Sequence, residues 1–291
     1  MNRHKNIDFL SLHKESQNLL VAASCLTYNK WSTKFLIYDK IPEKFSEPLE
    51  SNISDEFNTT SCCGEILEKG KFVVGDDDGN LALLSYDKSG IMELNKYPVA
   101  DSGLTSLITD SNNTVICGSF DGHVKVFLLD EERMTDFYDL HLAKVCSIYS
   151  LNSTNLFCST SLDGTCLLVD RKLKSPAKVI MNCPENPPTS VWAKDSSSFI
   201  IGTEAGTVQE YDLRNGAHPL KEYFQHNRSV TKVLKHNNAI VSSAEDGCIC
   251  TIKKEESRKF AVHTDIVTDM IDVGYILSCG WDGKICKFTE I

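Results

Sequence analysis

Apolar and polar residues alternate along short segments of this chain, and the segments recur at a regular interval. In each repeat a short apolar run leads into a tight turn that contains glycine, and a second alternating run follows. Alternation with a period of two predicts half-buried β-strands. A pair such as Asp121-Gly122 between two such runs predicts a hairpin, because glycine accepts a positive φ without steric cost. The pattern therefore predicts a succession of short β-hairpins.

The turn glycines give the period of the repeat. They are Gly79, Gly122, Gly164, Gly206, Gly247 and Gly283, with spacings of 43, 42, 42, 41 and 36 residues. A period in the low forties, with strands separated by turns, is typical of the blades of a β-propeller. A seventh unit lies upstream, with strands expected from Asn18 to Cys25 and from Lys34 to Asp39. We predict an all-β, seven-bladed β-propeller and treat residues 1–291 as a single domain.

Two recurring features resemble the WD-repeat family. The aromatic-Asp pairs Tyr38-Asp39, Tyr86-Asp87 and Tyr211-Asp212 end predicted third strands, where that family places such a pair. The family also places a histidine before the first strand of a blade to bind the turn aspartate of that blade. The matching pairs are His141 with Asp163, His226 with Asp246, and His263 with Asp282. A catalytic constellation occurs once, whereas these pairs recur, so we interpret them as structural; breaking one should cost about 1–3 kcal/mol.

Charge and cysteine content change this picture little. Forty acidic and thirty basic side chains give a net charge of −10, the wrong sign for a general nucleic-acid binder but suitable for a basic protein partner. The twelve cysteines show no paired CxxC spacing, so we expect reduced thiols and no metal site. No apolar run is long enough to span a bilayer, and no secretory signal is visible. We expect a cytoplasmic and nuclear protein with no membrane contact and no direct nucleic-acid contact.

Candidate catalytic motifs are absent from the sequence. It contains no GxxxxGK[ST], HExxH or GxSxG motif, so no sequence motif supports a phosphate-binding loop, a zinc protease or a serine hydrolase. We therefore predict a protein that is not an enzyme and needs no cofactor. The run Asp76-Asp77-Asp78 could bind a cation or a basic peptide, but we favour an acidic turn in which Asp78 is the turn residue and the other two face solvent.

Trp31 is the strongest candidate for a partner-binding residue. It lies with Tyr28 and Lys30 in the polar segment 27–33, which we expect to form a long connection between the second and third strands of the first unit. A tryptophan there is not needed for a blade core, and exposed aromatic side chains are typical interface hot spots. Local packing over the edge of the blade is the alternative.

Arg214 supports a different hypothesis. The run from Tyr211 to Arg214 resembles the motif by which many WD-repeat proteins dock onto the adaptor of cullin-ring ubiquitin ligases. The signal is weak, since the first two residues of the run recur for structural reasons.

The order of several segments resembles the WD-repeat subunits of the methylosome over nearly the whole chain, at low identity. The segments are residues 22–26 with Trp31 and 35–40, residues 187–192 leading to 206–208, and residues 261–267 with 280–282. The resemblance implies a non-catalytic scaffold that binds a type II protein arginine methyltransferase through its first blade, with Trp31 at the contact. It also implies a hetero-oligomer that recruits Arg-rich substrates such as histone tails and Sm proteins. A generic histone- or peptide-binding propeller that uses its central pore is a further alternative.

One departure from these relatives concerns the last blade. They carry a longer N-terminal lead, which supplies the outer strand of the last blade. Here the first strand is expected to begin near Ile7 and the third strand of the last unit runs to Ile291, which leaves little chain for a closing strand. A three-stranded last blade with an exposed edge is the expected consequence.

Overall fold

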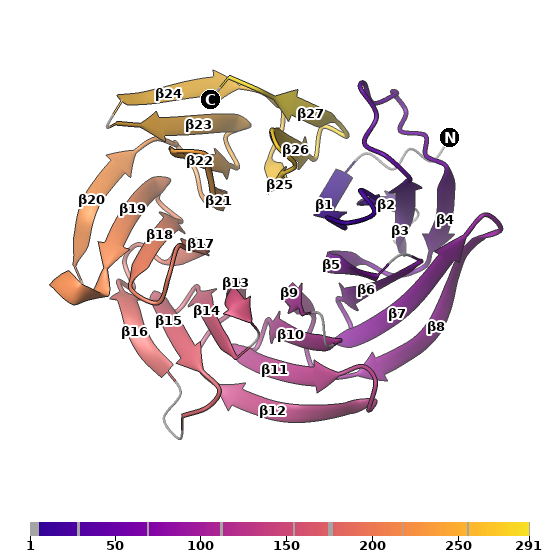
Figure 1. Cartoon of the computed structure of the whole chain (residues 1–291), viewed down its shortest axis with the longest axis horizontal. Helices are drawn as coiled ribbons and strands as arrows, with labels where there is room; N and C mark the ends of the chain where they lie inside the picture. The colour runs from indigo at the N-terminus through magenta and orange to yellow at the C-terminus, as the bar shows by residue number, and fades with distance from the viewer. Residues whose placement is uncertain are drawn as a thin grey trace.

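Antiparallel sheets are arranged in a ring in the computed structural model, and each sheet is one of the repeats seen in the sequence (Figure 1). The structure describes residues 6–27, 30–68, 70–110, 113–153, 155–173, 177–216, 218–254 and 256–290. Within these ranges the strands form seven sheets, six with four strands and one with three. The prediction of an all-β, seven-bladed propeller with a three-stranded last blade is confirmed.

The strands are numbered along the chain, and each blade runs from an inner to an outer strand. Blade 1 contains β1 (Asn6–Leu12), β2 (Leu19–Thr27), β3 (Lys30–Tyr38) and β4 (Ile53–Phe57). Blade 2 contains β5 (Ser61–Glu68), β6 (Lys71–Asp76), β7 (Asn80–Asp87) and β8 (Gly90–Pro98). Blade 3 contains β9 (Leu104–Thr109), β10 (Thr114–Ser119), β11 (His123–Leu128) and β12 (Arg133–Asp139).

The remaining blades follow the same order. Blade 4 contains β13 (Val145–Ser153), β14 (Leu156–Ser161), β15 (Thr165–Asp170) and β16 (Ala177–Asn182). Blade 5 contains β17 (Pro188–Ala193), β18 (Ser198–Thr203), β19 (Thr207–Asp212) and β20 (Pro219–Phe224), with a 3-10 turn, η1 (Leu213–Asn215), between the last two. Blade 6 contains β21 (Val230–His236), β22 (Ala239–Ala244), β23 (Cys248–Lys253) and β24 (Glu256–Ala261). Blade 7 contains β25 (Val267–Asp272), β26 (Ile276–Gly280) and β27 (Ile285–Phe288).

The turn glycines of blades 2 to 6 make the close contact between the hairpin of their blade and the loop that leads into the next blade. Gly247, between β22 and β23, has a φ of +75°, and a Cβ built on it would lie 2.7 Å from the carbonyl oxygen of His263. Any other residue would therefore meet both an unfavourable backbone region and a steric clash. The glycine at this position therefore allows both the tight hairpin turn and the close packing of the loop that carries His263.

The hydrophobic core lies between neighbouring blades. Between blades 6 and 7, for example, Val241 and Ile249 pack against Met270, Ile276 and Phe288. The strands are rich in β-branched and aromatic residues, which suit a pleated surface that is covered by a neighbouring sheet. Because a single blade leaves both faces apolar, the blades are stable only when they stack around a ring.

The ring closes between blades 7 and 1 by packing and by hydrogen bonds, and the two blades share no sheet. The hydroxyl of Thr268 donates to the carbonyl of Ile7 (2.6 Å), and the amide of Leu10 donates to the carboxylate of Asp269 (3.0 Å). Leu277 and other buried side chains of blade 7 join the apolar cluster of blade 1. Residues more than 250 positions apart in sequence therefore make the closing contacts.

Candidate functional site

The hairpin β2–β3 of blade 1 extends further than its counterparts. Its strands have nine residues each, whereas the second and third strands of blades 3 to 6 have six. Both β3 and β7 end at the aromatic-Asp pair of their blade, so the additional residues of β3 lie at the turn end. Three residues per strand correspond to about 10 Å of extra length. At this end Leu26 pairs with Trp31 across the hairpin, and Lys30 pairs with Thr27.

The extended hairpin exposes a pair of large apolar side chains. Trp31 is 45% exposed and its cross-strand partner Leu26 is 54% exposed. The expectation of a long polar connection over 27–33 was wrong, because Lys30 and Trp31 belong to β3 and continue the ladder with β2. Tryptophan and threonine favour a strand, and pairing across the hairpin satisfies their backbone groups. Lys30 is exposed, and Tyr28 lies outside the described residues.

The three predicted His–Asp pairs are in contact. His226 and His263 hydrogen-bond their aspartates directly. The Nδ1 atom of His141 hydrogen-bonds the hydroxyl of Thr165 (2.8 Å), which donates to Asp163 (2.6 Å). Nδ1 lies 3.3 Å from the carboxylate in His141–Asp163, 3.1 Å in His226–Asp246 and 3.0 Å in His263–Asp282. Each histidine uses Nε2 to contact a serine hydroxyl on the second strand of the same blade: Ser159 (2.8 Å), Ser242 (2.9 Å) and Ser278 (2.8 Å). The sequence reasoning missed these serines. Each stands four residues before the turn aspartate, and this constant spacing is the signal that could have found them.

The Ser–His–Asp networks contain the residue types of a hydrolase triad, but their geometry supports a structural role. The side chains of the three histidines and the three serines are fully buried, so a substrate cannot reach the hydroxyls. Burial lowers the pKa of His141 and His226, against the opposing effect of Asp163 and Asp246, so their neutral form is favoured. Each network ties a hairpin to the loop that enters its blade.

Blade 2 holds its turn by another aspartate. Asp76 is buried and accepts hydrogen bonds from the amides of Asp78 and Asn80 (3.1 and 2.7 Å), and it pairs with Lys96 of β8 at 2.8 Å. The expectation that Asp76 faces solvent was therefore wrong. A carboxylate that is paired and hydrogen-bonded in this way stabilises the turn. No cluster of metal-ligating side chains occurs among the described residues.

The inner strands line a channel of about 400 Å³ that contains charges of both signs. Lys232 and Asp269 form an ion pair at 3.0 Å across blades 6 and 7, and the Thr109 amide donates to Glu65 at 2.6 Å. Burial raises the pKa of Asp8 to about 7, against hydrogen bonds from Ser24 that lower it. The channel is thus a polar pore whose lining contains more acidic than basic side chains.

Cys62, one of the cysteines that line the channel, is a poor nucleophile. Cys62 donates to Asp77 at 3.1 Å, and burial, with this hydrogen bond, raises the pKa of the thiol to about 12. The thiolate is the reactive species, so Cys62 is inert at neutral pH. None of the twelve cysteines is joined to another by a disulfide.

Arg214 lies on the short turn η1 at the outer side of blade 5. Its guanidinium group contacts the carboxylate of Asp212 at 2.5 Å and 2.8 Å, and its side chain is mostly exposed. Two of its donors are therefore already used within the chain.

No protein-family model matches the sequence, and no curated protein matches it either. The architecture itself, seven blades with aromatic-Asp pairs and His–Asp contacts at recurring positions, is consistent with a WD-repeat protein. Among the described residues no helix has the length and apolar character that crossing a membrane requires.

Proposed function

We propose that the protein is a non-catalytic scaffold subunit of an arginine methyltransferase complex, which docks a type II protein arginine methyltransferase on the β2–β3 hairpin. The observation that carries the proposal is the exposed Trp31–Leu26 pair at the end of this hairpin. An aromatic side chain beside an aliphatic one, presented on a paired strand, loses little conformational entropy on binding.

The net charge of the chain supports a further part of the proposal, the recruitment of basic protein substrates. A net charge of −10 favours encounter with Arg-rich substrates such as histone tails and Sm proteins, because opposite potentials speed association. The buried Ser–His–Asp networks and the inert Cys62 thiol fit a platform that performs no chemistry itself. A peptide reader that uses the polar channel remains an alternative for the substrate.

The ubiquitin-ligase alternative depends on Arg214. Its guanidinium group is held by Asp212, so docking onto a ligase adaptor would have to share or break this pair. The structure offers no further observation in its favour.

The test is affinity purification of the full chain from cells, with mass spectrometry of stoichiometric partners. We expect an arginine methyltransferase to co-purify with the wild type and to be lost from Trp31→Ala. A hot-spot tryptophan contributes about 2–4 kcal/mol, so binding should weaken at least roughly thirtyfold. Trp281→Ala is the matched control, since Trp281 is exposed to the same extent (44%) on the turn of blade 7. Equal recovery of the enzyme with both variants would contradict the docking role of Trp31.

A further inference from the structure

The outer edge of blade 7 differs from every other blade edge in the ring. β27 pairs with β26 on one side, and none of the described residues pairs with its other side. In blade 6 the equivalent strand β23 is covered by β24, and there Cys250 and Thr251 are 0% and 6% exposed. Of their counterparts in blade 7, Cys286 is partly exposed and Lys287 is exposed. Backbone groups along β27 are therefore available for a further strand.

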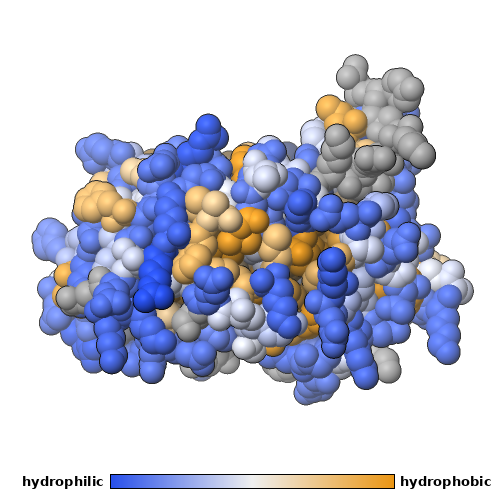
Figure 2. Space-filling view, turned by 90° about the horizontal axis from the view of Figure 1, so that it is seen from above, coloured by the Kyte–Doolittle hydropathy of each residue, from blue (hydrophilic) through white to orange (hydrophobic). Residues whose placement is uncertain are grey.

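Apolar surface is exposed beside this edge. Figure 2 looks onto the side wall of the ring where blades 6, 7 and 1 meet, and an apolar area lies in the middle of a mostly hydrophilic wall. A groove of about 190 Å³ runs there between β27 and the long β3–β4 connection of blade 1, lined by Ile285, Phe45 and Leu49 among others. The position of a fourth strand is thus a groove with apolar walls.

The other blades show what a strand in this position contributes. The second residue after the turn glycine faces a large side chain of the outer strand in each of five blades. The pairs are Leu81–Tyr97, Val124–Tyr138, Cys166–Met181, Val208–Tyr223 and Ile249–Phe260. These outer residues pack onto the next blade, as Phe260 does on Phe288 with ring centroids 5.0 Å apart. By this register, a strand added to blade 7 would place a large side chain opposite Ile285, against blade 1.

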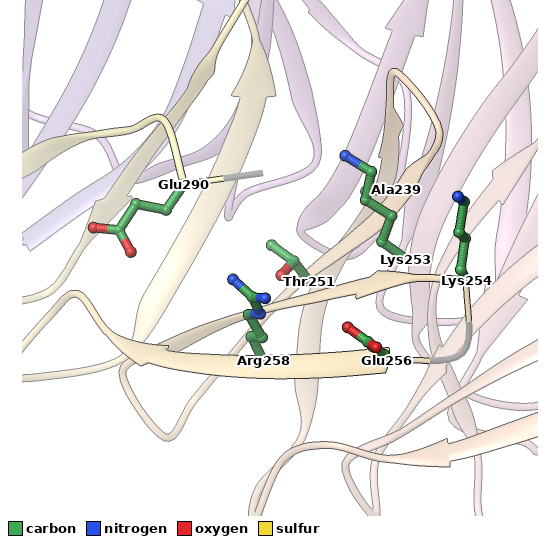
Figure 3. Close-up of a pocket in the computed structure, with 7 residues that line it drawn as sticks. All are labelled: Ala239, Thr251, Lys253, Lys254, Glu256, Arg258 and Glu290. Carbon is green, nitrogen blue, oxygen red and sulfur yellow. The ribbon is translucent and has the colours of Figure 1, made fainter.

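The edge is also basic within an acidic protein. The residues that line the groove and the adjoining pocket at the end of β27 include six basic and four acidic side chains. The basic ones are Lys44, Lys253, Lys254, Arg258, Lys284 and Lys287, and the acidic ones are Glu43, Glu47, Glu256 and Glu290. Figure 3 shows the cluster at the blade 6 end, with Lys253, Lys254 and Arg258 on one side and Glu290 across the gap. An acidic strand fits this edge better than a basic one.

We propose that blade 7 is a docking groove for an extended segment of a partner protein, which pairs antiparallel with β27 as a fourth strand. The segment carries an aromatic residue or methionine opposite Ile285 and acidic residues opposite Lys287 and Lys284, the latter sharing its ammonium group with Glu47 at 3.7 Å. Main-chain hydrogen bonds then supply affinity, and the side-chain positions supply specificity, as in other cases of β-strand addition. This proposal is independent of the Trp31 hairpin and of the enzyme proposed to bind there.

Charge disfavours two other occupants of the groove. A second copy of the chain paired through β27 would bring Lys284 and Lys287 of both copies into one short ladder, and like charges across a ladder are destabilising. The residues before β1, Met1 to Lys5, include Arg3 and Lys5 and no aromatic side chain, so they lack the expected complement.

The probe for the test is an acetylated, fluorescein-labelled peptide, Ser-Thr-Glu-Thr-Phe-Glu, whose phenylalanine falls opposite Ile285 in the register of blade 6. We expect saturable binding to the full chain by fluorescence polarisation, and slower amide hydrogen exchange confined to residues 284–289. A peptide with serine in place of phenylalanine, and one with lysine in place of both glutamates, should bind more weakly.

Two protein variants locate the site. Lys287→Glu should weaken binding roughly fivefold, since it replaces an attractive cross-strand pair by a repulsive one. Lys178→Glu is the matched control on an exposed outer strand, β16, and should leave binding unchanged.

Three results would overturn the proposal. The first is binding that is insensitive to both peptide changes and to Lys287→Glu. The second is concentration-dependent dimerisation in sedimentation that the peptide abolishes, which would assign the edge to a second copy. The third is exchange protection of 284–289 without peptide that disappears on deletion of residues 1–5, which would assign the edge to the chain itself.

Discussion

Blades 6 and 7 are built on the same plan and end differently. Both have a Ser–His–Asp network, with His226 and His263 at equivalent positions, and in both a positive-φ glycine follows the aspartate. Blade 6 then adds β24, which covers β23, whereas in the part of the chain that the structure describes no strand pairs with the outer side of β27. The comparison teaches that three inner strands and one buried network are sufficient to form a blade. The fourth strand decides whether the side wall of the ring is closed.

The fourth strand also changes the network of its own blade. In blade 6, Lys259 of β24 contacts Asp246 at 2.7 Å, in addition to His226 and the amide of Asn227. Asp282 of blade 7 has the histidine and the amide contacts, with no lysine among the described contacts. Burial raises the pKa of Asp246, but Lys259, the Asn227 amide and His226 outweigh this effect and hold it at about 2.

The largest expected effect comes from breaking the contact between the two blades. Phe288→Ala removes a buried ring of β27 that packs on Phe260 of β24. We expect the free energy of unfolding to fall by about 3–5 kcal/mol, the usual cost of a cavity of this size. Urea denaturation of both variants is the measurement, with Phe260→Ala as the matched control. Phe260 is only partly buried, so an equal or larger loss in that variant would contradict the view that β27 supplies the core of this interface.

A smaller effect separates the two aspartates at neutral pH. Asp246→Asn should cost about 2–3 kcal/mol and Asp282→Asn about 1–2 kcal/mol, since only the former leaves a lysine of the outer strand without its carboxylate. Denaturation of Lys259→Met and of the double variant with Asp246→Asn completes a double-mutant cycle. If β24 is the cause, the two aspartate substitutions should cost nearly the same in the Lys259→Met background. A difference that persists there would locate the cause elsewhere.

The smallest effect is a difference in acid sensitivity. The pKa of Asp246, at about 2, and that of Asp282 are both below the unfolded value of about 4. Each carboxylate therefore contributes stability that is fully present above about pH 4–5 and is lost as the pH falls toward 2. Unfolding free energies measured between pH 5 and 2.5 should fall less steeply in Asp246→Asn than in the wild type. Asp282→Asn should flatten the curve less, and identical slopes in the two variants would count against the extra stabilisation by Lys259.

The sequence by itself determined the features that depend on neighbouring residues. The turn glycines and the alternation around them specify hairpins, and their period specifies seven blades. The spacing of His226 and Asp246 specifies their contact, because a glycine-centred turn brings the aspartate back to the loop that carries the histidine. The three strands of the last blade were also predicted by counting alternating segments.

Only the tertiary structure decided the features that join distant parts of the chain. Asp76 looked like an exposed acidic turn until Lys96 of a later strand was found beside it. Trp31 looked like a loop residue, because a polar segment carries no alternation that would reveal a strand. The hydrogen bonds from the Thr268 hydroxyl to Ile7 and from the Leu10 amide to Asp269 close the ring over some 260 residues. The periodicity of apolar residues indicates which face of a strand is buried, but it does not indicate which other segment packs against that face. The groove beside β27 could therefore be identified only from the folded ring.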